Sequence, residues 1–268
     1  MPIDVPGYIY VQQNADYSLP YPGEGFTGWT NLNIPLDPSR TAIVIMHAWD
    51  ILPYEQCPGI HRMCEYVLRS QKIMEERFPS FLEAVRNSSI RLIHVGSSTE
   101  KTLATHPKYQ EILKKYPEVP HPRMQISEQT QRLWDLHQRI GSCSEENEQD
   151  FLMSCEHRDF GIKPLDTEDL VCTSEQLYAV CLEHGIEHLI YTGFAVNWCL
   201  VYNECGMVDM NKYGVMCSIV GDLTTAVENK ESCRTQEHLK YGLWQFATYN
   251  GFVFLADDLK HTLLQVVP

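Results

Sequence analysis

Short, mostly apolar runs separated by stretches with helical spacing are the feature that most constrains how this chain can fold. The main runs lie at 41–46, 90–95, 186–191, 215–220 and 252–255, with a shorter run at 169–172. Such runs are typical of strands that are buried on both faces of a parallel sheet. The stretches between them predict helices at 60–86 (with a break at Pro79), 175–183 (capped by Ser174), 197–213 and 233–249. The alternation predicts an α/β fold: a three-layer sandwich with a mostly parallel, Rossmann-like sheet and helices on both faces.

The two remaining parts of the chain differ from this rhythm. Residues 1–40 are rich in Pro, Gly, Tyr and Asn and predict an ordered N-terminal arm with one short strand at 8–11. Residues 98–165 are polar and predict an insertion with a helical piece at 127–140. We therefore expect an arm (1–40) followed by one α/β domain (41–268) that carries the insertion.

Composition excludes several functions. The net charge of −14 argues against a nucleic-acid partner, because phosphate backbones are bound mainly by Lys and Arg clusters. The ten cysteines show no Cys-x-x-Cys pair and no zinc-finger spacing, so we expect reduced thiols and a cytoplasmic protein. The N-terminus does not look like a signal peptide, and no apolar run has the length of a membrane span. We expect no membrane partner.

Cys199 stands out among the cysteines because of its predicted position. It falls in the first turn of the helix predicted at 197–213, directly after a strand and the turn at Gly193. In open α/β sheets, sites form beyond the carboxyl ends of the strands. A helix N-terminus favours a thiolate, so we expect a depressed thiol pKa and N–H groups that hold an oxyanion. The alternative is that Cys199 is a small buried hydrophobe, and position alone leaves both open.

The segment 190–200, Ile-Tyr-Thr-Gly-Phe-Ala-Val-Asn-Trp-Cys-Leu, resembles the signature of the isochorismatase-like cysteine hydrolases, which include nicotinamidases and carbamoylsarcosine amidases. The resemblance extends over about 38–97 and 165–260, including the lead-in at 38–42. It implies that Cys199 is the nucleophile and that the peptide bond between Phe194 and Ala195 is cis. It also implies oxyanion donors at the N–H groups of Ala195 and Cys199, and assembly into a homo-oligomer.

The chain departs from the rest of the family's catalytic set, an Asp after the first strand and a Lys after the third. Anchored on the lead-in, the Asp position holds His47, whereas a one-residue slip that keeps Asp50 places Met46 there. We prefer the first register, in which His47 is the base for Cys199 and Asp50 orients it. The third strand runs into Thr and Ser, and Lys163 precedes that strand, so the Lys is missing.

Further residues complete the expected site. Phe194, with Trp49, Asn197 and Trp198, is expected to surround the substrate pocket, although such aromatics are also common in cores and oligomer interfaces. His94 is either a polar group of this pocket or packed under the insertion. The Asp-x-His-x-x-His run with which some relatives bind a metal is not found, so we expect neither a metal nor another cofactor.

The function expected from the sequence is hydrolysis of a small amide, ester or related carbonyl compound. The Cys199 thiolate attacks this small-molecule substrate and forms a covalent acyl-enzyme. The alternative is a catalytically silent binding or scaffold protein on the same fold, since the Asp and Lys are not found and fold alone does not fix function.

Overall fold

A computed structural model of the protein describes residues 2–97, 99–142, 145–249 and 251–265. Its main sheet has eight strands in the order β2-β1-β10-β9-β8-β3-β5-β7. These strands are β1 (Ile3–Val11), β2 (Gly28–Leu36), β3 (Thr41–Met46), β5 (Arg91–Val95), β7 (Asp169–Val171), β8 (His188–Phe194), β9 (Met216–Thr225) and β10 (Val253–Phe254). The predicted α/β fold with a mostly parallel sheet is confirmed.

The order of the strands reverses at the centre of the sheet. The strands from β3 through β5 to β7 follow one another outward in one direction, and those from β8 through β9 to β10 follow in the other. The central pair, β3 and β8, is parallel and runs from Thr41–His188 to Met46–Gly193. This pair is the topological switch point, where the loops after the two strands diverge and leave a crevice.

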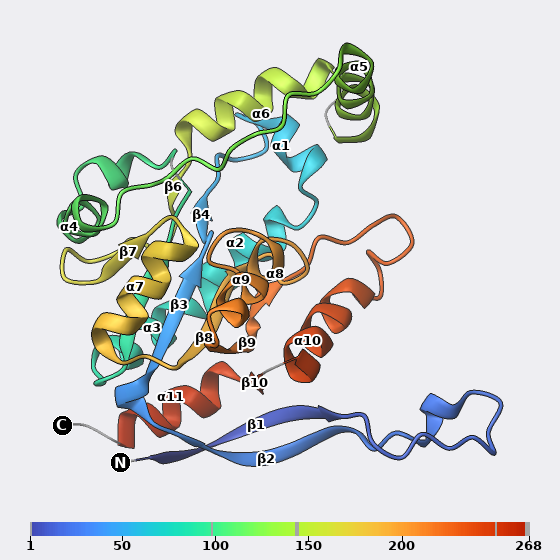
Figure 1. Ribbon diagram of the computed structural model, residues 1–268, viewed down its shortest axis with the longest axis vertical. Helices are drawn as coiled ribbons and strands as arrows, with labels where there is room; N and C mark the ends of the chain where they lie inside the picture. The colour runs from blue at the N-terminus through green and yellow to red at the C-terminus, as the bar shows by residue number, and fades with distance from the viewer. Residues whose placement is uncertain (1, 98, 143–144, 250, 266–268) are drawn as a thin grey trace.

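Helices cover both faces of the sheet (Figure 1). One apolar core contains residues from α7 (Ser174–His184), α8 (Cys199–Tyr202), α9 (Met207–Lys212) and α10 (Glu237–Tyr249). The other contains residues from α3 (Phe78–Arg86) and α11 (Ala256–Gln265), with α2 (Val67–Glu76) packed alongside. The sheet between them is the middle of three layers.

Strand β3 explains why its sequence is apolar without alternation. Ala42, Val44 and Met46 belong to one core, whereas Ile43 and Ile45 belong to the other. Successive side chains of a strand point to opposite faces, so a strand between two helix layers needs apolar residues at every position.

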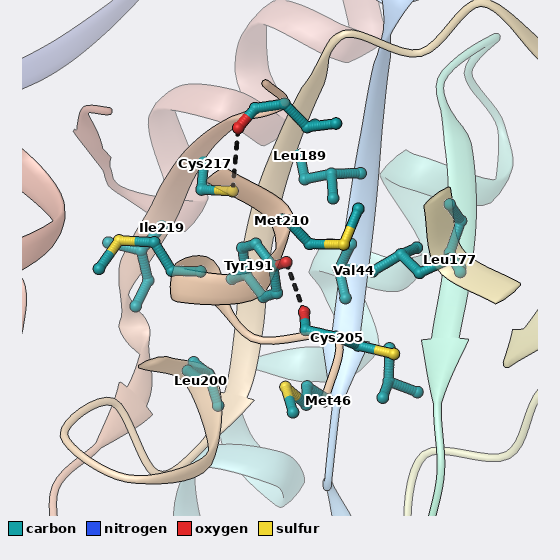
Figure 2. Packing of buried hydrophobic residues seen from close by; sticks show 14 of the residues in the cluster. Val44, Met46, Leu177, Leu189, Tyr191, Leu200, Cys205, Met210, Cys217 and Ile219 are labelled. Atoms are coloured by element: carbon teal, nitrogen blue, oxygen red, sulfur yellow. Dashed lines mark hydrogen bonds between the residues drawn. The ribbon is translucent and has the colours of Figure 1, made fainter. Parts of the chain in front are cut away.

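Tyr191 of β8 fixes the segment between α8 and α9 against the sheet. Its hydroxyl donates a hydrogen bond of 2.6 Å to the backbone carbonyl of Cys205, deep in the core (Figure 2). Cys205 has a φ of 64°, which is outside the helical region. The single helix predicted at 197–213 is therefore wrong, and two short helices stand in its place.

Two other predictions about helices need correction. The region predicted as one helix at 60–86 forms α1 (Pro58–Met63), α2 and α3, and Pro79 lies in the first turn of α3, where its missing N–H costs nothing. Helix α7 is capped by Thr173 rather than Ser174, through a capping box with Gln176. It ends at Gly185, as predicted.

The N-terminal arm is more ordered than the sequence suggested. Instead of one short strand, it forms the long hairpin of β1 and β2, which pairs with the main sheet through Tyr8 and Val253. Figure 1 shows the hairpin extending along one side of the molecule, beyond β10.

The insertion contains α4 (Pro107–Lys115), α5 (Glu128–His137) and α6 (Glu145–His157), together with the short strand β6 (Asp159–Phe160). Strand β6 pairs antiparallel with β4 (Trp49–Asp50), which follows β3. This two-stranded ribbon brings the end of the insertion back to the switch point. In the described part of the chain, no helix is both long and apolar enough to cross a bilayer.

We predict that Gly193→Ala destabilises the protein far more than Gly185→Ala. An added Cβ at Gly193, with a φ of 103°, would lie 2.0 Å from the carbonyl oxygen of Met46, whereas at Gly185, with a φ of 66°, it would meet nothing within 4 Å. Gly185→Ala should cost about 1–2 kcal/mol for its backbone conformation. Gly193→Ala should cost more than about 4 kcal/mol in urea unfolding. Equal losses would contradict the close β3–β8 approach.

Candidate active site

The two residues on which the sequence prediction rests follow the two central strands of the sheet. His47 follows the last residue of β3, and Cys199 begins α8, five residues after the end of β8. Since Met46 pairs with Gly193, the two loops leave the sheet side by side. The site therefore depends on the backbone pairing of the central strands.

The turn between β8 and α8 has the conformation that the resemblance implied. The peptide bond between Phe194 and Ala195 is cis. Phe194 is fully buried against Phe78, and the N–H of Val196 donates to the carbonyl of Thr225, so the turn is fixed from both sides. The N–H groups of Ala195 and Cys199 both lower the pKa of the Cys199 thiol by hydrogen bonding to the sulfur. Both backbone N–H groups therefore favour the thiolate form of Cys199.

The Cys199 thiol nevertheless has a raised pKa, which corrects the expectation of a depressed value. Burial is the largest cause and outweighs the two N–H groups and the positive charge of Arg158. Helix α8 has only four residues, so its macrodipole is small. In the free protein, Cys199 is a protonated thiol at neutral pH.

His47 lies in a strained and buried position beside this turn. Its φ is 52°, its side chain is almost fully buried, and its ring stacks on Trp49 with a centroid separation of 4.5 Å. Burial, and next the charge of Arg158, lowers the pKa of His47 to about 3, so the ring is neutral. Its Nδ1 has no hydrogen-bond partner among the described residues, Cys199 included.

The prediction that Asp50 orients His47 is wrong. Asp50 is exposed and pairs through its backbone with Asp159 of the β4–β6 ribbon. Neighbouring side chains of a strand point to opposite faces, so Trp49 turns toward His47 and Asp50 turns away.

The prediction that His94 lines the pocket is also wrong. Its side chain is fully buried within β5, and its Nε2 lies 2.8 Å from the carboxylate of Glu168, which also binds Arg86. This contact lowers the pKa of Glu168 to about 2, against the effect of burial. The His94–Glu168–Arg86 group joins β5 to the segment before β7 and has a structural role.

Asn197 and Trp198 lie on the far side of the turn. The Asn197 amide makes two hydrogen bonds of 2.9 Å with the backbone of Val227, which fix the loop after β9. Trp198 is about half exposed, at 53%. Neither residue lines the cavity next to His47.

That cavity has a volume of about 390 Å³ and lies over the carboxyl ends of β3, β5 and β7. Most of its lining residues are polar, and among those that the structure describes there are two carboxylates and no Lys or Arg: His47, Gly96, Ser97, Glu118, Cys172, Thr173, Asn203 and Glu204. Burial, and next the neighbouring Glu175, raises the pKa of Glu204. The outer wall of the cavity is therefore acidic.

Three further candidates for the site were not predicted from the sequence: Arg158, Glu100 and Tyr66. The Arg158 guanidinium lies 3.8 Å from the Trp49 ring centroid, and Glu100 accepts a hydrogen bond of 2.8 Å from the Trp49 indole N–H. Tyr66 is buried, and the neighbouring Cys64 and Cys199 thiols add to the effect of burial in raising its pKa. Their spacing along the chain gives no signal, because each comes from a different loop or helix.

The last two groups to place are Lys163 and any set of side chains that could bind a metal ion. Lys163 is exposed, and its carbonyl accepts a hydrogen bond from Arg86, away from the Trp49 stack. Among the described residues, no cluster of three or more His, Cys, Asp or Glu side chains is arranged to hold a metal ion.

Comparison with known proteins gives matches among solved structures alone. No protein-family model matches the sequence, and no curated protein does. The fold is similar to a cysteine hydrolase from Pseudomonas syringae pv. phaseolicola 1448A, with 10% identity, coverage of 88% of this chain and 97% of that chain, and a TM-score of 0.48. It is also similar to an isochorismatase-like hydrolase from Alkaliphilus metalliredigens (16% identity, 83% and 98% coverage, TM-score 0.45). A third similar structure is the Escherichia coli YcaC gene product, an octameric hydrolase of unknown specificity (10% identity, 88% and 85% coverage, TM-score 0.43).

We predict that His47 makes the folded state less stable in acid. Its pKa is lowered from the ordinary 6.5 to about 3, so below pH 6.5 the unfolded chain binds a proton that the folded chain excludes. Stability should fall by up to about 1.4 kcal/mol per pH unit between these values. His47→Asn, which tolerates a positive φ, should remove this part of the pH dependence of thermal unfolding. His188, with a pKa lowered to about 4, remains in both proteins as a control. Parallel pH profiles would contradict a buried neutral His47.

Proposed function

We propose that the protein is a cysteine hydrolase that acts on a small amide, ester or related carbonyl compound through Cys199. The observation that carries this proposal is the position of Cys199, a partly buried thiol at the start of α8, directly after the turn with the cis peptide bond at the switch point of the sheet. The backbone N–H groups of Ala195 and Cys199 favour its thiolate form. The turn sequence at 190–200 and its cis peptide bond support membership of the isochorismatase-like family.

The reaction proceeds in two halves. The Cys199 sulfur attacks the carbonyl carbon while the thiol proton passes to the neutral imidazole of His47, and the N–H groups hold the oxyanion. The carbon–nitrogen or carbon–oxygen bond of the leaving group then breaks, and His47 returns the proton to that group. Water cleaves the resulting thioester: one proton moves through His47 to the sulfur, and the acid product leaves.

The pKa values restrict when this reaction can start. A thiol with a raised pKa and an imidazole with a pKa of about 3 do not exchange a proton in the free protein. Proton transfer must therefore accompany the attack on a bound substrate, when the N–H groups stabilise the new negative charge. On this proposal the thiol stays protonated until substrate fills the site.

The cavity beside His47 suggests which substrates bind. Glu118 and Glu204 line its wall, and a second anion close to them would be repelled. We infer that the part of the substrate that occupies this cavity is polar and neutral, or carries a positive charge.

The second candidate function is a catalytically silent binding protein on the same fold. The raised pKa of Cys199 together with the lowered pKa of His47 favours it, because both groups stay neutral. Such a protein binds the same small molecules in the cavity and releases them unchanged.

We predict that a mixture of small amides and esters gives an acyl adduct on Cys199, detected by mass spectrometry of the intact protein and its peptides. Cys199→Ala should abolish both adduct and product, and turnover should fall at least about 1000-fold. Cys233→Ala, which removes an exposed cysteine away from the turn, should match the wild type. Ligand-induced thermal stabilisation that persists in Cys199→Ala, with no product from the wild type, would support the silent binding protein instead.

A further inference from the structure

The guanidinium group of Arg158 is held at the switch point although the residue belongs to the insertion. Arg158 directly precedes β6, whose pairing with β4 places it next to Trp49. The guanidinium carbon lies 3.8 Å from the Trp49 ring centroid, and the side chain is only 14% exposed. Trp49 in turn stacks on His47. Trp49 therefore lies between the positive charge of Arg158 and the ring of His47, the proposed base.

The hydrogen bonds of Arg158 hold one part of the guanidinium and leave another part unpaired. Nη2 donates to the hydroxyl groups of Ser97, at 2.8 Å, and Thr99, at 2.7 Å. Nε is buried and has no hydrogen-bond acceptor within the described residues. A buried N–H of a cation without an acceptor is costly, so it favours an incoming oxygen or sulfur anion.

Glu100 is the counter-ion of Arg158, but it does not satisfy this donor. Its Oε1 lies 3.8 Å from Nε, beyond hydrogen-bond distance. The carboxylate instead accepts hydrogen bonds from the Trp49 indole and from the hydroxyl and backbone N–H of Ser97. Because neutral donors occupy the carboxylate, Arg158 retains a free N–H while its charge is partly balanced.

We propose that Arg158 is the cation of the Cys199 site, stabilising the thiolate and the oxyanion that forms when it attacks. This inference rests on the proposed function in taking Cys199 as the reacting thiol. A guanidinium keeps its proton at all relevant pH values, so Arg158 supplies charge while His47 alone moves the proton. The insertion thereby provides the positive charge that Thr173 and Ser174, which follow β7, do not.

The test is the pH dependence of the rate of iodoacetamide alkylation at Cys199, followed by peptide mass spectrometry from about pH 7 to about pH 11, because the pKa of this thiol is raised. Arg158→Gln should raise the midpoint by about one unit, so that alkylation at a pH below the midpoint is about tenfold slower. Arg158→Lys should restore the wild-type behaviour, because the positive charge returns. Its alkylation rate below the midpoint should lie within about threefold of the wild-type rate. Arg132→Gln, which removes an exposed arginine of the same insertion, is the matched control and should leave the midpoint unchanged.

A second variant covers the case in which Arg158→Gln does not fold. Glu100→Gln removes the opposing charge and should shift the midpoint in the other direction, to a lower pH. Cys233, which is exposed, serves as the internal reference in every sample. Midpoints that stay at the wild-type value in Arg158→Gln, or in Glu100→Gln, would overturn the inference. The alkylation assay needs no turnover, so shifted midpoints without any acyl adduct would sustain Arg158 as the cation and reject the hydrolase.

Discussion

The close approach of β3 and β8 is the constraint on which the rest of the structure depends. Gly193 faces the Met46 carbonyl at a distance that leaves no room for a Cβ, so only glycine permits the two strands to end side by side. The next residue of β3 is then His47, and the turn after Gly193 leads to Cys199. Both elements of the proposed chemistry follow from one backbone contact at the switch point of the sheet.

Burial at that point determines the charges of the side chains. The thiol of Cys199 and the imidazole of His47 are both kept neutral, and the nearby ion pair is that of Glu100 and Arg158. A buried pair of this kind contributes little net stability, because desolvation offsets the attraction between its charges. We propose that its value lies in a fixed positive charge near a site where negative charge develops during the reaction. Glu118 and Glu204 line the cavity beside His47, and we propose that their charge disfavours an anionic substrate there.

The sequence predicted those parts that depend on local pattern. The runs at 41–46 and 186–191 are apolar because both faces of the sheet are covered, and the cis bond before Ala195 followed from the resemblance of the turn. The helix predicted at 197–213 failed because Cys205 breaks it while the apolar spacing continues. Arg158 could not have been predicted, since its place beside Trp49 depends on two strands of two residues each that are distant in sequence. The expected role of Asp50 failed for the same reason, because the ribbon turns its side chain away from His47.

The central claim is that Cys199, His47 and Arg158 share one electrostatic site, and NMR titration of the His47 ring tests it most directly. With isotope-labelled histidine, the wild-type ring should remain neutral down to about pH 4, in keeping with a pKa of about 3. In Arg158→Lys the titration should be unchanged, and in Arg158→Gln it should move to higher pH, because the repelling charge is gone. A His47 ring that titrates near the ordinary 6.5 in all three proteins would contradict the account.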